Sequence, residues 1–115
     1  MTERQLREPT RLVLTALADA PRHGYAIIQE VLAISGGRTR LSTGTLYTAL
    51  DRLLHEGAVR IEREEVVDSR LRRTFALTEQ GQDLLAEEAR RLRLAASEAE
   101  RRLTVARLRP NGALA

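Results

Sequence analysis

LSTGTLYTALDRLLHEG, residues 41–57, is the stretch of this chain that decides its fold. Its leucines recur at the three- and four-residue spacing of a helix with one apolar face, which would lie against a core: Leu46, Leu50, Leu53 and Leu54. Ser42 can cap the N-terminus of such a helix, and Gly57 can end it in the left-handed conformation. The stretch therefore predicts one short helix with well-defined ends.

The first turn of this helix carries small hydroxyl side chains, at Ser42, Thr43, Thr45 and Thr48, which leave the helix open to an approaching surface. Val59 to Ile61 then alternate like a strand, and an arginine-rich turn follows around Asp68-Ser69-Arg70. A capped helix with a polar first turn, followed by a basic hairpin, is typical of a winged helix-turn-helix that reads DNA.

Several short motifs, in this order and spacing, resemble the PadR family of bacterial transcriptional regulators: His23-Gly24-Tyr25, Ser42-Thr-Gly-Thr-Leu-Tyr47, Leu50, Arg52-Leu53, Glu56-Gly57, Leu77-Thr78 and Gly81. The resemblance covers roughly residues 9 to 81, and the remainder fits the short members of that family, which end in one long helix. It implies a homodimeric DNA-binding regulator, by family habit a repressor, on a near-palindromic operator.

The size and composition of the chain indicate one small domain without covalent staples. A chain of 115 residues buries roughly two-thirds of its unfolded surface, which suffices for a small core. It has no cysteine, so disulfides and thiolate metal sites are excluded. Its longest apolar runs are too short to span a bilayer, and residues 1–5 lack the apolar segment of a secretory signal. We therefore expect a soluble cytoplasmic protein.

All 19 basic residues are arginine, although the formal net charge is only +3. Coding bias in a GC-rich genome accounts for this pattern, and so does phosphate binding, because guanidinium makes forked contacts that lysine cannot. Residues 1–57 hold 7 arginines and 6 acids, residues 58–78 hold 5 and 4, and residues 79–115 hold 7 and 6. Basic charge is thus spread evenly along the chain, and a DNA-facing patch has to be assembled in space.

The predicted fold is mainly α with a small β-hairpin: a winged helix-turn-helix over residues 1–78, a dimerisation helix over 79–109 and a flexible tail over 110–115. A first helix should have Pro9 in its first turn, bury Val13 and Ala20 and end at Pro21, and a second should start near Gly24 and end before Gly36. In the hairpin, Val59 and Ile61 are expected on the inner face.

The predicted DNA contacts come from the second helix, the turn before the third, the third helix itself and the wing: Tyr25, Arg38, Arg40, Ser42, Thr43, Gly44, Thr45, Tyr47, Thr48, Arg52, Arg70 and Arg72. Hydroxyls and free N–H groups at a helix start bind phosphates, and arginines bind the backbone or the minor groove. Gly44 would let the DNA backbone approach closely.

Two of these assignments keep an alternative, and two further wing arginines are left out of the set. Tyr47 is equally a core residue with a solvated hydroxyl, and the ring of Tyr25 is expected mainly to pack. Arg63 is surrounded by acids and is less favoured as a contact. Arg73 falls on the inward register of its strand and could brace the wing instead.

The last helix carries a seam at heptad spacing, which favours a homodimer because so long a helix exceeds what its own domain can cover: Leu85, Ala89, Leu92, Ala96, Ala99 and Leu103, continuing to Ala106. Alanine-rich seams bury little area. We therefore expect other surfaces to contribute, such as the first helix with Leu6, Leu12 and Val13.

Nothing in the sequence predicts catalysis, a cofactor or a metal site. His23 and His55 are the only histidines, and neither has the spacing of a ligand set or a catalytic pair. The alternative function is a winged-helix module that docks a protein partner without DNA. An unidentified small-molecule effector fits the family, but the last helix has no aromatic residue, so a site that stacks flat aromatic ligands is not expected there.

Overall fold

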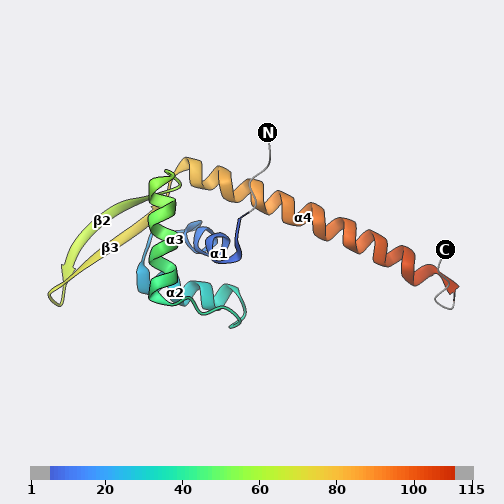
Figure 1. Ribbon diagram of the computed structural model, residues 1–115, viewed down its shortest axis with the longest axis horizontal. Coiled ribbons are helices and arrows are strands. Elements are labelled where there is room, and N and C mark those ends of the chain that lie inside the picture. Colours follow the sequence, from blue (N-terminus) through green and yellow to red (C-terminus); the bar gives the residue numbers. More distant parts are fainter. Residues whose placement is uncertain (1–5, 111–115) are drawn as a thin grey trace.

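The computed structural model describes residues 6–110, which form four helices and three strands (Figure 1). The order is α1 (Glu8–Leu17), β1 (Arg22–His23), α2 (Gly24–Ile34), α3 (Thr43–His55), β2 (Val59–Val67), β3 (Arg70–Leu77) and α4 (Glu79–Leu108). The strands form one antiparallel sheet in the order β1-β3-β2. This confirms the predicted winged helix, with a third strand that the hairpin prediction missed.

Strand β1 escaped prediction because it is only two residues long. Arg22 pairs with Phe75 and His23 with Thr74. A two-residue strand has no alternation to detect, and its existence depends on β3, some fifty residues later in the chain. It ties the start of α2 directly to the base of the wing.

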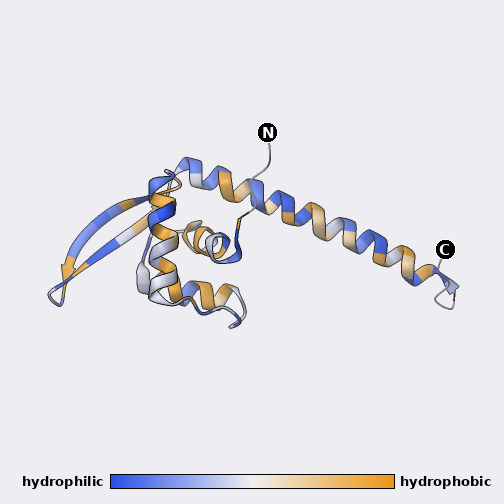
Figure 2. Cartoon of the chain, viewed as in Figure 1, coloured by the Kyte–Doolittle hydropathy of each residue, from blue (hydrophilic) through white to orange (hydrophobic). Residues whose placement is uncertain are grey.

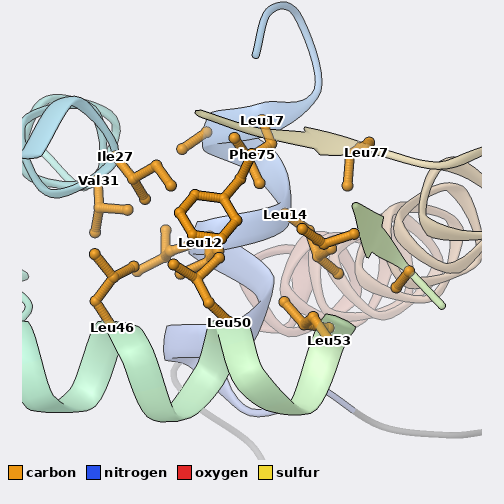
Figure 3. Packing of buried hydrophobic residues seen from close by; sticks show 14 of the residues in the cluster. Leu12, Leu14, Leu17, Ile27, Val31, Leu46, Leu50, Leu53, Phe75 and Leu77 are labelled. Carbon is orange, nitrogen blue, oxygen red and sulfur yellow. The ribbon is translucent and has the colours of Figure 1, made fainter. Parts of the chain in front are cut away.

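The core lies where α1, α2 and α3 meet the base of the sheet, and Phe75 is at its centre (Figure 3). Figure 3 shows side chains from all three helices turned toward the Phe75 ring, among them Leu12, Ile27 and Leu50. The predicted apolar face of α3 is confirmed, since Leu46, Leu50 and Leu53 are fully buried and Leu54 is half-buried. This core holds α3 with its opposite face in solvent.

The first helix ends earlier than predicted. α1 stops at Leu17, and Ala18 to Ala20 form bends, with Ala20 only half-buried. The residue before a proline disfavours helical backbone, so Pro21 prevents continuation. The Arg22 guanidinium donates to the carbonyl oxygen of Ala16 at 2.8 Å, and so satisfies a carbonyl that a further helical turn would have bonded.

The wing is the hairpin of β2 and β3, closed by a two-residue turn at Asp68 and Ser69, both with positive φ (51° and 65°). The pairing shifts register between Ile61 and Arg63. Ile61 was expected on the inner face beside buried Val59, but it is 39% exposed. Beyond this irregularity the hairpin leaves the core, so no apolar surface remains to cover Ile61.

The joint between the wing and α4 is rigid at Gly81. A Cβ there would collide with the carbonyl oxygen of Ala58. The predicted cap at Thr78 is confirmed, since its hydroxyl accepts from the Gly81 N–H at 3.0 Å and donates to the Gly57 carbonyl at 2.6 Å. Gly57, with φ +80°, ends α3 as predicted.

Glu88 is a buried charge that the sequence did not reveal. Its side chain, in a residue only 3% exposed, accepts two bonds from the Arg91 guanidinium at 3.0 and 2.7 Å. These bonds, with help from the Leu6 N–H and the Arg11 charge, lower the pKa of Glu88 despite burial. Glu88 therefore anchors α4 to the segment that leads into α1.

Beyond Arg91, α4 projects away from the domain and every residue from Leu92 to Pro110 is exposed (Figure 1). In Figure 2 hydrophobic and hydrophilic residues alternate along this projecting half. The tail predicted over 110–115 lies outside the described residues apart from Pro110.

Candidate nucleic-acid interface

The first turn of α3 is capped as the sequence predicts. The Ser42 hydroxyl oxygen accepts from the Thr45 N–H at 3.1 Å and donates to the Thr45 hydroxyl at 3.0 Å. Thr43, Gly44, Thr45 and Thr48 are all exposed. At 100° per residue, Gly44, Thr48, Asp51 and His55 form the middle of the exposed face, opposite the buried leucines. This face of α3 is the surface that a groove could accept.

Gly44 has no packing reason to be glycine. A Cβ at this position would have no atom within 4 Å. Since the backbone is helical and φ is not positive there, any small residue would fit the isolated domain. The absence of a side chain is compatible with the close approach of an external surface at this point.

Tyr47 packs on the core and also reaches the surface, so both interpretations left open by the sequence remain. Its ring meets Phe75 edge-on, with centroids 6.3 Å apart and an interplanar angle of 67°. The residue is nevertheless 40% exposed, and its hydroxyl lies beside Gly24 at the start of α2. Tyr47 thus packs on the core through one edge and presents the rest to the surface.

Tyr25 does not pack its ring, contrary to the main sequence expectation. His23 caps α2 by accepting from the Ala26 N–H at 3.3 Å, and Gly24 is buried against Tyr47. The next position therefore points outward, and Tyr25 is 69% exposed. The less favoured interpretation, a contact with an external ligand, is the one that this placement leaves open.

A surface hollow of about 750 Å³ joins the wing to the start of α2 and to α3; we call it the wing hollow. Its lining includes both tyrosines and the arginines of the wing: Tyr25, Tyr47, Arg70, Arg72 and Arg73, with His23, Gly24, Val67, Asp68 and Leu71. Of these tyrosines and arginines, all except Arg73 were predicted as DNA contacts. The hollow therefore brings predicted contacts that lie almost fifty positions apart in the sequence to one surface.

Ion pairing divides the arginines of the winged domain into two groups. Away from the exposed face of α3 they are paired with acids: Arg11 with Glu8, Arg22 with Asp19 and Glu30, Arg60 with Glu62, Arg63 with Glu65 and Arg73 with Glu64. Around that face, within residues 6–110, no acid pairs with Arg7, Arg38, Arg40, Arg52, Arg70 or Arg72. Their charge is available to an anionic ligand.

The two doubtful arginines of the wing belong to the paired group. The Arg73 Nε donates to the Glu64 carboxylate at 2.5 Å, across from β3 to β2. Arg73 therefore braces the wing, which was one of its two interpretations. Its side chain is exposed, however, and does not lie on the inner face of the strand as expected. The Arg63 Nε lies 3.7 Å from the carboxylate of Glu65 on its own strand, which agrees with the expectation that acids occupy Arg63.

The turn before α3 is held by Ser35. Its hydroxyl oxygen accepts from the Thr39 N–H at 2.9 Å. Gly36 and Gly37 there adopt positive φ, with open space around both. The Arg38 Nε donates to the Ser35 carbonyl at 3.4 Å, and Arg40 is exposed. Both guanidinium groups therefore lie at the surface just before α3.

A second hollow, of about 500 Å³, was not predicted at all; we call it the α1 hollow. The segment around the start of α1 forms one wall and α3 the other: Arg7, Pro9 and Thr10 face Ser42, Gly44, Thr45, Thr48, Ala49 and Arg52. Arg7 lies before the first helix with no motif around it, so its proximity to Arg52 depends on the tertiary packing of α1 on α3.

The seam of α4 continues the face by which this helix docks on its own domain. Leu85 is half-buried and packs against the core, as does Leu84. Ala89, Leu92, Ala96, Ala99 and Leu103 are exposed. Leu94 and Val105 are exposed apolar residues on the opposite face. The part of the helix from Ala89 to Leu103 thus offers an uncovered apolar seam.

Leu6, Leu12 and Val13 cannot supply the extra dimer surface suggested from the sequence. All three are buried in the core of their own domain. The amphipathic pattern of α1 was correctly recognised, but its apolar face is already occupied by α2, α3 and the sheet.

The described helices include none with the length and apolar character to cross a bilayer. Between Leu6 and Pro110 no three acidic or histidine side chains cluster as metal ligands would.

Comparison with known proteins assigns this chain to a family. The model of the transcriptional regulator PadR-like family matches residues 13–87. The chain is 38% identical, over 80 residues, to the transcriptional regulator Rv3488 of Mycobacterium tuberculosis, a match that covers 70% of this chain and 71% of that protein. It is 46% identical over 78 residues to an uncharacterized 37.1 kDa protein in transposon TN4556 of Streptomyces fradiae. That match covers 68% of this chain but only 21% of the longer protein.

Two solved structures share the fold. A PadR family transcription regulator from Clostridium difficile superposes with a TM-score of 0.70 at 20% identity, covering 84% of this chain and 99% of that one. The PadR of Bacillus subtilis, solved in complex with operator DNA, has a TM-score of 0.63 at 20% identity, covering 72% of this chain and 47% of that one.

Proposed function

Because this chain belongs to the PadR-like family of transcriptional regulators, we propose that it binds a near-palindromic operator as a homodimer and represses transcription there. The family is one of DNA-binding regulators and not of enzymes. The observation that carries the proposal concerns the arginines between Leu6 and Leu77: those around the exposed face of α3 have no acidic partner within residues 6–110, while the others in this range are paired with acids.

In the proposed complex α3 enters the major groove. The exposed face with Thr48 at its middle meets the base edges, and threonine can contact the thymine methyl group. Ser42, Thr43 and Thr45, with the free N–H groups of the first turn, bind backbone phosphates. Gly44 lets the backbone come close because nothing projects from it.

The wing hollow would hold the strand on one side of that groove. Arg70 and Arg72 supply its free positive charge, because Arg73 is committed to Glu64. Arg38 and Arg40 extend this charge to the turn before α3, and Arg52 adds charge at the α1 hollow. Tyr25 and the exposed part of Tyr47 can donate from their hydroxyls to phosphate oxygens. The operator complex of the Bacillus subtilis protein, which has the same fold, supports DNA as the ligand.

We propose the domain boundaries of this assembly as residues 1–78 for DNA binding and 79–109 for dimerisation. The support is the exposed apolar seam of α4, from Ala89 to Leu103, for which a second copy of the same helix is a suitable cover. The two copies of α3 would then enter successive major grooves, about 34 Å apart. Anything that changes the angle between α4 and its domain would change that spacing, and an effector could regulate binding in this way.

A charge-matched pair of wing variants tests the proposal. The variant with Arg70→Ala and Arg72→Ala should lose affinity for all DNA sequences and show a shallower salt dependence, by about 0.9 in slope for each phosphate that is no longer neutralised. The variant with Arg63→Ala and Arg73→Ala removes the same charge from the same hairpin but only from paired residues. It should keep most of the wild-type slope. Equal slopes in both variants would contradict the proposal and would favour the alternative, a module that docks a protein partner.

A further inference from the structure

The α1 hollow lies on the side of α3 away from the wing. Figure 1 shows β2 and β3 extending to one side of α3 and α1 on the other. On α3 itself, Thr45 and Arg52 line the α1 hollow while Tyr47 lines the wing hollow. The exposed face of α3 therefore runs between two hollows, each with arginines in its lining.

The charge of the α1 hollow is uncompensated. Arg7 and Arg52 come from different ends of the domain, and neither has an acidic partner within the described part of the chain. Glu8, the acid next to Arg7, pairs with Arg11 and does not line the hollow. An anion in this hollow would be attracted by both guanidinium groups.

Thr10 gives an independent indication of a polar ligand. The residue is only 5% exposed and lines the hollow, yet its hydroxyl has no hydrogen-bond partner within residues 6–110. The N-cap position of α1 is Arg7, which makes no capping bond, so no side chain between Leu6 and Pro110 caps the first turn from this position.

We propose that the α1 hollow holds a backbone phosphate of the DNA strand that borders the major groove on the side opposite the wing. Arg7 and Arg52 contact its oxygens, and the Thr10 hydroxyl donates to it. A helix that lies in the major groove has one strand on each side, so a phosphate grip on both sides fixes its rotation as well as its depth. This inference rests on the proposed DNA-binding function and assigns Arg7 and Thr10, which no sequence motif marks.

The first test compares Arg7→Ala with Arg60→Ala on a duplex selected in vitro by the wild-type protein. Arg60 is a paired arginine of the same domain, near the base of β2. Arg7→Ala should weaken binding about tenfold or more, because charged hydrogen bonds are strong. It should also reduce the salt slope by about 0.9 for each subunit. Arg60→Ala should change neither. An Arg7→Ala protein with wild-type affinity and slope overturns the inference.

The second test locates the phosphate. Single phosphates of the duplex are replaced in turn by neutral methylphosphonates, and the loss of affinity is measured for wild type and for Arg7→Gln. At the contacted phosphate the replacement should weaken wild type and have no further effect on the variant. The same loss at every position in both proteins overturns the inference. Thermal unfolding of both Arg7 variants should match wild type, because the side chain is exposed.

Three further outcomes separate the inference from the proposed function. A wild-type protein that binds no duplex contradicts both. If Arg70→Ala with Arg72→Ala weakens DNA binding and Arg7→Ala does not, only the inference fails. A titration with inorganic phosphate gives the third result: if Arg7→Ala abolishes phosphate binding and leaves DNA binding intact, the hollow is a site for a free anion and the inference is again wrong.

Discussion

The Tyr47 hydroxyl lies so close to Gly24 that a Cβ at Gly24 would be 2.5 Å from its oxygen. This contact connects the start of α2 to α3 and holds the phenol between the core and the wing hollow. The position of an exposed side chain in the candidate interface is thus set by a buried glycine on a different helix.

We predict that Gly24→Ala displaces the Tyr47 ring. The new methyl group would also lie 3.2 Å from the ring carbon Cζ, so the phenol has to shift against Phe75. Overpacking of this kind costs about 1 kcal/mol of stability, which urea unfolding measures, and DNA affinity should fall as well. Gly44→Ala is the matched control for stability, because a Cβ there meets open space. If Gly24→Ala is as stable as Gly44→Ala, the contact does not constrain Tyr47.

Gly81→Ala should be the most damaging glycine substitution of the domain. Its Cβ would collide with the backbone carbonyl of Ala58, which cannot move away as a side chain can. The collision also disrupts the Thr78 cap, so we expect a loss of at least about 2 kcal/mol in the free energy of unfolding. Chemical denaturation measures it. A loss below about 0.5 kcal/mol, less than a helix cap alone typically contributes, would mean that α4 leaves the domain at a different angle.

Glu88 should make stability depend on acid pH. Its pKa is held below the ordinary value of 4.5, chiefly by the hydrogen bonds from Arg91. A lowered folded pKa stabilises the protein above the unfolded pKa, and the benefit is lost as pH falls through the folded value. Glu88→Gln should therefore cost about 1–3 kcal/mol at pH 7, and the difference from wild type should shrink below about pH 4. A constant difference across that range would contradict this account.

The role of the α4 seam in dimerisation can be tested with two glutamate substitutions at positions of similar exposure. Leu103→Glu places a charge on the seam, whereas Val105→Glu places one on the opposite face. Only Leu103→Glu should weaken a dimer, by about tenfold or more in dissociation constant, because a charge buried between two helices is left unpaired. Sedimentation velocity over a range of concentrations reports this. Equal behaviour of the two variants would mean that the seam is not the dimer interface.

The local features of this fold could be predicted from the sequence because their causes lie within a few residues. Ser42 and Thr78 cap the helices that follow them, and Gly57 ends α3. The unpredicted features depend on distant partners. β1 exists only through β3, and Ile61, although it pairs with buried Phe75, is left exposed where the hairpin leaves the core.

In the candidate interface, too, the features that depend on distant residues could not be predicted from the sequence. The hydroxyls of α3 and the wing arginines were identifiable from their order along the chain, since a winged helix brings them to one face. Counting charges could not show that Arg73 is paired with Glu64 while Arg70 and Arg72 are not. Nor could it show that Arg7 and Arg52 line the same hollow, because the packing of α1 on α3 decides that.

The most direct test of the account is the fluorescence anisotropy of labelled DNA from upstream of this protein's own gene, titrated at about 50 and about 200 mM salt against a scrambled duplex. With two wing arginines from each of two subunits on phosphates, affinity for the upstream duplex should fall roughly a hundredfold between these salt concentrations. It should exceed affinity for the scrambled duplex at both. Weak binding that is equal for the two duplexes and insensitive to salt would contradict the claim that the unpaired arginines around α3 form a DNA-binding surface.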